Sequence, residues 1–167
     1  MPNDDFGIAR VDVASWQETY RGLLPEEYLA ALRVDERSSR WRRVLQSLNS
    51  EFMILVAEQG GDVIGFIYAG INRDEDSEYL GELYALYLLP SWLRRGMGRQ
   101  LVQAVATQLM GVGLNSMMVE VLRENWGARS FYTRLGGEYL GERTLEFEAG
   151  SFPAVAYGWR DLKRLLP

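Results

Sequence analysis

The first fifty residues of the chain carry apolar positions at helical spacing among polar ones. Ile8, Val11 and Ser15 fall on one stripe of an amphipathic helix, and Gly22 and Pro25 interrupt the pattern that follows it. We predict three helices in this part of the chain, over residues 4–20, 25–32 and 35–48. The N-terminal part of the chain is therefore expected to be helical.

After residue 50 the pattern changes to short apolar runs separated by turn-forming residues. Runs over residues 52–57 and 63–71 flank a Gly-Gly-Asp turn, which predicts a β-hairpin. Further along we predict, in order, a strand over 79–89, a helix over 96–110, a strand over 116–122, a helix over 128–135 and two strands over 139–148 and 154–159. The turn between the last two strands is assigned to residues 150–153, whose sequence Gly-Ser-Phe-Pro is typical of turns.

This order of elements predicts an α+β fold, in which a central, mostly antiparallel sheet is flanked by helices. The strand–helix–strand unit over residues 79–122 is its clear parallel crossover. A chain of 167 residues with 47% apolar residues can bury one full core, whereas half of it could not. We therefore expect residues 1–167 to form a single domain.

The composition excludes several kinds of catalytic site. The chain has no Cys and no His, so it cannot build a thiolate or imidazole nucleophile, a zinc site with the usual ligands, or a disulfide. We expect no metal. Catalysis then has to rely on carboxylates, hydroxyls, Lys, Arg, backbone amides or a bound cofactor.

Charge and hydropathy limit the partners. A net charge of −5 argues against a broad nucleic-acid surface and favours a cationic partner or substrate. No run of about eighteen apolar residues occurs, and the first five residues are acidic where a signal peptide would be basic. We therefore expect a soluble, cytoplasmic protein that binds neither nucleic acid nor membrane.

The turn over residues 93–98 is the first candidate for ligand binding. It joins a strand that ends at Pro90 to a helix that begins near Gly98, and free amides at a helix N-terminus attract phosphate while glycine allows its close approach. An ordinary tight turn is the alternative. Arg99 after the second glycine excludes a Walker loop, and Leu101 excludes a dinucleotide-binding fingerprint, which needs a third glycine or alanine there.

Three sequence blocks resemble the GCN5-related N-acetyltransferases, the GNAT family, which transfer acetyl from acetyl-CoA to amines. They are Glu-Leu-Tyr-Ala-Leu-Tyr-Leu-Leu-Pro over residues 82–90, Arg-Arg-Gly-Met-Gly-Arg over 94–99, and Asn-Trp-Gly-Ala-Arg-Ser-Phe-Tyr-Thr-Arg-Leu-Gly over 125–136. The resemblance implies the GNAT fold, N-acetyltransferase activity and acetyl-CoA as the acyl donor.

The chain departs from the family's pattern at two places. Leu93 stands where the family usually has Gln or Arg, so the resemblance implies that backbone amides carry most of the pyrophosphate binding. The family also usually opens with a strand, whereas here a helix is predicted almost directly after Met1. We expect that strand to be absent, or the sequence to begin at an internal start.

The resemblance further implies which residues bind the acyl donor. Its pantetheine arm is expected between two splayed parallel strands, on the free backbone of the first. The implied contacts are Leu86, Tyr87 and Leu88 for this arm, Leu93, Arg94, Arg95, Gly96, Met97, Gly98 and Arg99 for the pyrophosphate, and Asn125 and Tyr132 beside them. Leu86 and Leu88 also fit as core residues, and Asn125 fits as the cap of the following helix.

Transfer to an amine requires a base, because an amine with a pKa near 10 is mostly protonated at neutral pH. By resemblance Glu82 is expected to be that base, with Glu120 on the other splayed strand, or water alone, as alternatives. A solvated carboxylate at the end of a strand is the non-catalytic interpretation of Glu82. Tyr132 resembles the tyrosine that protonates the departing thiolate, and packing beside Phe131 is its alternative role.

The acceptor pocket is expected between the N-terminal helices and the strand edges. Trp16, Tyr20 and Tyr84 are the residues predicted to line it and to face a cationic amine, and anchoring of helices to the sheet is their alternative role. The acceptor is expected to be an amine of a small molecule or of a protein or peptide. A homodimer is also expected. Two alternatives keep the same fold: a longer acyl-CoA as the donor, and a non-catalytic sensor of acetyl-CoA.

Overall fold

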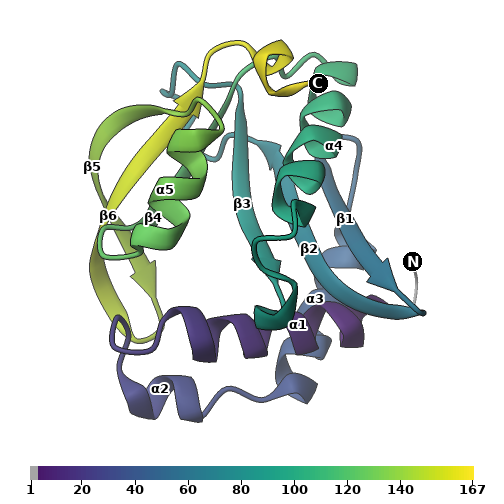
Figure 1. Cartoon of the computed structure of the whole chain (residues 1–167), viewed down its shortest axis with the longest axis vertical. Helices are drawn as coiled ribbons and strands as arrows, with labels where there is room; N and C mark the ends of the chain where they lie inside the picture. The colour runs from purple at the N-terminus through teal and green to yellow at the C-terminus, as the bar shows by residue number, and fades with distance from the viewer. Residues whose placement is uncertain (1–3) are drawn as a thin grey trace.

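The computed structural model describes residues 4–167. Three helices come first, α1 (Asp4–Thr19), α2 (Glu26–Ala30) and α3 (Val34–Ser47), and each lies where the sequence predicted a helix. Ile8 and Val11 of α1 are fully buried, because the apolar stripe of this helix packs against α3 and the sheet. Figure 1 shows the three helices gathered at one end of the sheet.

Six strands within residues 4–167 form one mixed sheet in the order β1-β2-β3-β4-β6-β5. They are β1 (Phe52–Gln59), β2 (Asp62–Ile71), β3 (Gly81–Leu88), β4 (Met117–Leu122), β5 (Glu138–Phe147) and β6 (Gly150–Trp159). Of these strands only β3 and β4 pair in parallel, and every other neighbouring pair is antiparallel. The predicted α+β fold with one parallel crossover is confirmed.

Helices cover both faces of the sheet. Phe66 of β2 packs with α1 and α3, while the next residue, Ile67, packs with α4, because successive strand residues point to opposite faces. Figure 1 shows α4 and α5 in front of the strands. The remaining helices are α4 (Met97–Gly111), α5 (Trp126–Arg134) and two short 3₁₀ helices, η1 (Pro90–Trp92) and η2 (Leu162–Leu165).

A bulge in β3 sets the direction of side chains near the site. Tyr68 and Ala69 are consecutive in β2, but their partners in β3 are Ala85 and Leu83, so Tyr84 is an extra residue between them. The alternation of side chains along β3 therefore changes at Tyr84. Residues before and after the bulge that lie three apart in sequence share a face of the sheet.

One predicted turn is wrong. Residues 150–153 belong to β6, because Phe147 at the end of β5 already pairs with Gly150 across the turn. Pro153 is tolerated within the strand because the ladder between β6 and β4 begins only at Ala154. The local Gly-Ser-Phe-Pro composition favours a turn, and the long pairing of β5 with β6 overrides it.

The structure also bears on the expected membrane and metal contacts. None of the helices within residues 4–167 is long and apolar enough to cross a membrane. The same residues contain no group of three or more acidic side chains placed to hold a metal ion. The cytoplasmic location stays a prediction.

Candidate active site

The start of α4 is arranged to receive an anion. Gly96 has a left-handed backbone with φ of 82°, and Arg94 also has a positive φ of 59°. The helix begins at Met97 with no side-chain cap and no acidic residue in its first turn. Its first amides are therefore open to an external acceptor, and the positive end of the helix dipole favours a negatively charged one.

The second glycine of this turn is required by packing. A Cβ added at Gly98 would lie 3.2 Å from the ring of Phe131 on α5 and 3.6 Å from Leu88 on β3. A larger side chain would push α5 away from the start of α4. The other predicted pyrophosphate residues lie around the turn, where Leu93, Arg94, Arg95 and Arg99 are exposed.

Strands β3 and β4 separate after a short paired stretch. Their ladder ends at the pair Leu83–Val119, although β3 continues to Leu88 with β2 on its other edge. The edge of Leu86 and Tyr87 that faces β4 therefore has no strand partner. An extended ligand with amide groups fits such an edge, because unpaired backbone groups need hydrogen-bond partners.

Asn125 and Tyr132 both belong to α5. Asn125 caps this helix, since its Oδ1 accepts a hydrogen bond from the N–H of Ala128 at 3.2 Å. Tyr132 is buried between Phe131 and Trp159. Burial raises the pKa of Tyr132 well above its ordinary value, so its hydroxyl keeps its proton at neutral pH. The side-chain contact of Asn125 is that of a helix cap, which is the alternative role expected for it. The contacts of Asn125 and Tyr132 with acetyl-CoA stay predictions.

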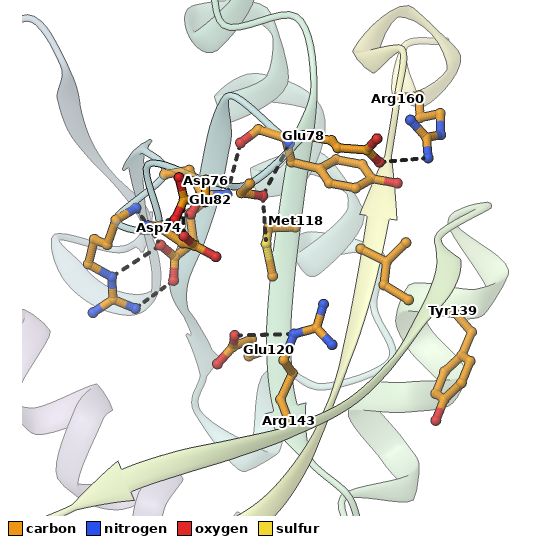
Figure 2. Close-up of a pocket in the computed structure, with 14 residues that line it drawn as sticks. Asp74, Asp76, Glu78, Glu82, Met118, Glu120, Tyr139, Arg143 and Arg160 are labelled. Carbon is orange, nitrogen blue, oxygen red and sulfur yellow. Dashed lines mark hydrogen bonds and ion pairs between the residues drawn. The ribbon is translucent and has the colours of Figure 1, made fainter.

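A pocket of about 820 Å³ lies over the start of β3 and the middle of β4. It is on the face opposite α4, because Leu83 and Val119 pack into the core with α4 and their neighbours Glu82 and Glu120 point the other way. Figure 2 shows the two glutamates among the other residues that line it. The remaining charged lining residues are Arg73, Asp74, Asp76, Glu78, Arg143 and Arg160.

Glu82 is buried, with an exposed fraction of 6%, and is held by Arg73. The Nη2 group of Arg73 donates to Oε1 at 2.5 Å, and its Nε and backbone N–H each donate to Oε2 at 3.1 Å. The guanidinium of Arg73 also lies 4.7 Å from the ring centroid of Tyr84. Three donors thus occupy the carboxylate and leave it few lone pairs for a substrate proton.

Glu120 is less restrained by partners. Its side chain is 26% exposed, and the Nε of Arg143 lies 3.9 Å from its Oε1. Burial raises the pKa of Glu120, and the nearby charge of Glu82 raises it further, against the lowering effect of Arg143 and Arg73. A carboxylate with a raised pKa is a stronger base. Glu120 is therefore better placed than Glu82 to accept a proton.

The aromatic residues predicted to line the acceptor site are not among the residues lining this pocket. Trp16 and Tyr20 are buried in a cluster with Tyr87 and Phe147, where the hydroxyls of Tyr20 and Tyr87 lie 2.8 Å apart. Tyr84 packs against a neighbouring tyrosine of β2. For Trp16 and Tyr20, the contacts observed are those that anchor α1 to the sheet, and acceptor contacts stay predictions.

Sequence reasoning missed Arg73, Asp74 and Arg143. No element and no site is predicted for residues 72–78, although their acidic residues around one arginine directly precede the strand of Glu82. Nothing in the sequence indicates that Arg143 approaches Glu120. Arg143 lies on β5 and Glu120 on β4, and β6 separates these two strands in the sheet.

Comparison with known proteins places the chain in a family. The family model of the acetyltransferase (GNAT) family matches residues 14–137. The chain is 36% identical over 158 residues to YuaI, an uncharacterized N-acetyltransferase of Bacillus subtilis (strain 168), covering 95% of this chain and 88% of that protein. It is 36% identical over 89 residues to the mycothiol acetyltransferase of Kocuria rhizophila, covering 52% of this chain and 29% of that protein.

Solved acetyltransferases share the fold. PaiA N-acetyltransferase from Thermoplasma acidophilum, solved with coenzyme A, matches with a TM-score of 0.68 and 23% identity over 95% of this chain and 94% of that one. YncA of Salmonella typhimurium, solved with acetyl-CoA, matches with a TM-score of 0.70 and 18% identity over 97% and 90%. The family match includes the α4 turn, the separating strands and both pocket glutamates. The chain therefore belongs to the acetyltransferase (GNAT) family, and it is an N-acetyltransferase by that membership.

Proposed function

We propose that this N-acetyltransferase binds acetyl-CoA on the α4 side of the sheet and acetylates a primary amine held in the pocket on the other side. The position of Glu82 and Glu120 is the observation that supports this most. Glu82 lies beside the last pair of the β3–β4 ladder and Glu120 directly follows that pair, so both carboxylates stand where the strands begin to separate. An acyl group on one face can meet an amine on the other face there.

The residues of this chain suit such a donor. The open amides at the start of α4, with Arg94, Arg95 and Arg99 exposed around them, suit the pyrophosphate. The edge of β3 at residues 86–88 has no strand partner and suits the amides of the pantetheine arm, although Ser15 Oγ donates a hydrogen bond to the Leu88 carbonyl at 3.0 Å. Bound acetyl-CoA supplies an acetyl thioester, whose C–S bond is exchanged for a C–N bond to the acceptor.

Glu120 accepts the proton of the acceptor's ammonium group, directly or through one water. The raised pKa of its carboxyl suits this role, and Glu82 supports it with negative charge while its own oxygens are occupied by Arg73. This assignment reverses the expected order of the two glutamates. Tyr132 keeps a proton at its hydroxyl, and that proton is available to the departing sulfur.

An amine panel with acetyl-CoA tests the proposal, read by thiol release and by mass spectrometry of the product. Glu120→Gln is expected to lower turnover by about 10²- to 10⁴-fold while acetyl-CoA affinity is retained, as for loss of a general base. The matched control is Glu124→Gln, an exposed glutamate after β4, which should keep its activity. Full activity of Glu120→Gln would remove Glu120 from the mechanism.

Two other results would change the proposed role of the protein or its acyl donor. Binding of acetyl-CoA without acetylation of any amine would identify a sensor, and turnover only with longer acyl-CoA would change the class of donor. If acetyl-CoA did not bind at all, as measured by calorimetry, the proposed function would be wrong.

A further inference from the structure

Three guanidinium groups line the acceptor pocket, and they differ in how firmly they are held. Arg73 donates three hydrogen bonds to the carboxylate of Glu82. Arg160 donates to the carboxylate of Glu78 at 3.2 Å. The carboxylate paired with Arg143 is 3.9 Å away, which is beyond hydrogen-bond distance. Among the three, Arg143 is therefore the guanidinium that is open to a ligand.

Most hydrogen-bond donors of Arg143 are unused. A guanidinium group carries five N–H donors. Within residues 4–167, Arg143 makes one hydrogen bond, from Nη1 to the carbonyl of Glu142 at 2.8 Å. Its side chain is 38% exposed, so a ligand can reach the remaining donors. Two neighbouring N–H groups of a guanidinium match the two oxygens of a carboxylate, and Arg143 is therefore suited to bind one.

The sheet brings Arg143 and Glu120 onto one face. Glu120 of β4 pairs with Ala156 of β6, and Arg143 of β5 pairs with Ala154 of β6. Paired residues share a face, and so do Ala154 and Ala156, which are two residues apart in one strand. The side chains of β6 at these two positions are methyl groups and leave room above the strand. Arg143 therefore extends over β6 towards Glu120, as Figure 2 shows.

The other acidic groups of the pocket lie away from Arg143. Asp74 and Asp76, in the loop between β2 and β3, are beside Glu82 in Figure 2, whereas Arg143 is beside Glu120. An anionic group bound to Arg143 is thus kept apart from the acids of that loop. A ligand between Glu120 and Arg143 meets a negative group on one side and a positive group on the other, which complements an amine and a carboxylate in one molecule.

We propose that the acceptor is a free α-amino acid, whose amine is acetylated at Glu120 while its carboxylate is bound by Arg143. This inference rests on the proposed function and names its substrate class. The distance of 3.9 Å between Arg143 Nε and Glu120 Oε1 supports this class, because an amine and a carboxylate on the same carbon atom can engage both groups together. The amine of a lysine side chain is several carbons from its carboxylate, and its chain would have to fold back. A pocket of about 820 Å³ also lies in the range of small-molecule sites.

Arg143 binds and orients the acceptor and exchanges no bond itself. Glu120 takes one proton of the ammonium group, and the amine nitrogen then forms the C–N bond while the C–S bond of the thioester breaks. The sulfur leaves with the proton of Tyr132, and the nitrogen loses its second proton to solvent, which restores Tyr132. The carboxylate of the amino acid is unchanged in the product. Its contact with Arg143 holds the amine at the separation of β3 and β4.

A comparison of each free amino acid with its own carboxamide tests this inference. The carboxamide keeps the amine and the side chain and lacks the negative charge. Arg143→Gln is expected to reduce the ratio of kcat/KM for the free acid to kcat/KM for the carboxamide by about tenfold or more, the effect of losing a charge-assisted hydrogen bond. The two amines differ in basicity, and Arg143 also acts on Glu120, but both effects cancel when this ratio is compared between variant and unchanged chain. An unchanged ratio would overturn the inference.

Two further variants control this comparison. Arg143→Lys keeps the positive charge and loses the planar pair of donors, so its ratio should lie between those of the unchanged chain and Arg143→Gln. Arg164→Gln removes an exposed guanidinium that does not line the pocket, and it should keep the ratio of the unchanged chain. Turnover of the carboxamide and the melting temperature show that each variant is folded. An equal fall in the ratio for Arg164→Gln would contradict a specific contact with Arg143.

The same panel separates failure of this inference from failure of the proposed function. A lysine peptide that is acetylated more efficiently than every free amino acid would overturn the substrate class. If amines with and without a carboxylate are acetylated equally well, only the substrate class is wrong. If acetyl-CoA binds and no amine is acetylated, the proposed function is wrong as well.

Discussion

At the scale of single residues, the two pocket glutamates differ in their partners more than in their positions. Glu82 accepts three hydrogen bonds from Arg73, whereas the nearest guanidinium group paired with Glu120 is 3.9 Å away. Burial and the charge of Glu82 together raise the pKa of Glu120. The choice of base therefore depends on contacts with arginines from a loop and from a distant strand.

The coupling between the two glutamates gives a direct titration test. Glu82→Gln removes a negative neighbour of Glu120 and releases Arg73, and both changes favour the ionised form of Glu120. The pKa of Glu120 is expected to fall in this variant. Carbon-13 NMR titration of labelled glutamate carboxyls, assigned with Glu120→Gln, measures it.

A variant of opposite sign controls this titration. Arg143→Gln removes a positive neighbour, so the pKa of Glu120 should rise. If Glu82→Gln left the titration of Glu120 unchanged, or moved it upward, the two carboxyls would not interact as described.

Removing the hydroxyl of Tyr132 tests its role as a proton donor. Tyr132→Phe is expected to lower kcat by about tenfold to a hundredfold, at the lower end of general-acid effects, because a thiolate is a tolerable leaving group. The ring contacts with Phe131 and Trp159 are kept, so the melting temperature and the affinity for acetyl-CoA should be preserved. Unchanged kcat would leave Tyr132 with a packing role only.

At the scale of elements, the start of α4 and the end of the β3–β4 ladder form the two halves of one proposed donor site. The first turn of α4 is closely packed at Gly98, where α5 and β3 meet it. The bulge at Tyr84 adds a second condition, because it turns Glu82 toward the acceptor face while Leu86 stays on the donor face. Elements distant in sequence thus meet at one opening in the sheet.

A larger residue in the first turn of α4 should damage donor binding. Gly98→Val would place its side chain against Phe131 and displace amides that are proposed to bind pyrophosphate. We expect the Kd for acetyl-CoA to rise by about tenfold or more, the effect of losing one charge-assisted hydrogen bond. Calorimetry measures this change.

The other end of the same helix supplies a control. An added Cβ at Gly111 meets no atom within 4 Å, so Gly111→Val should bind acetyl-CoA like the unchanged chain. If Gly98→Val retained full affinity, the backbone of this turn would not be the pyrophosphate site.

The predicted elements agree closely with the observed ones where the pattern is local. Helix α4 was expected over residues 96–110 from its apolar spacing and is observed at Met97–Gly111. The turn expected at residues 150–153 is wrong because Pro153 lies within a strand stabilised by long-range pairing with β5. Composition reports local preference, and sheet register can override it.

At the scale of the whole molecule, buried carboxylates join α1 to α3. Asp5 accepts a hydrogen bond from Ser38 at 2.7 Å and two from Arg42 at 2.8 and 3.1 Å. Asp12 accepts one from Trp41 at 2.8 Å. These contacts hold together the helical layer that packs on the sheet face carrying the acceptor pocket.

The hydrogen bond from Ser38, together with Arg42, lowers the pKa of Asp5 against the opposing effect of burial. Asp5 therefore adds stability that is present above its unfolded pKa of about 3.9 and is lost as pH falls through its lower folded pKa. We expect Asp5→Asn to reduce the free energy of unfolding by about 1–2 kcal/mol at pH 7. The difference from the unchanged chain should narrow below about pH 4.

Urea unfolding followed at several pH values measures this effect. The matched control is Asp62→Asn, whose surface pair with Arg10 at 3.5 Å should contribute less than about 1 kcal/mol. A difference between Asp5→Asn and the unchanged chain that stayed constant down to pH 3 would show that the charge of Asp5 is not what stabilises the contact.

The sequence by itself determined the order of helices and strands, the absence of thiol and imidazole chemistry, and the family, because periodicity, composition and ordered motifs are properties of neighbours along the chain. Only the tertiary structure decided that Arg73 binds the carboxylate of Glu82 and that Arg143 of β5 approaches Glu120 of β4. It also decided that Trp16 and Tyr20 pack in a cluster outside the pocket. Those relations depend on which strands lie side by side and which face each side chain takes, and a bulge of one residue reverses that face.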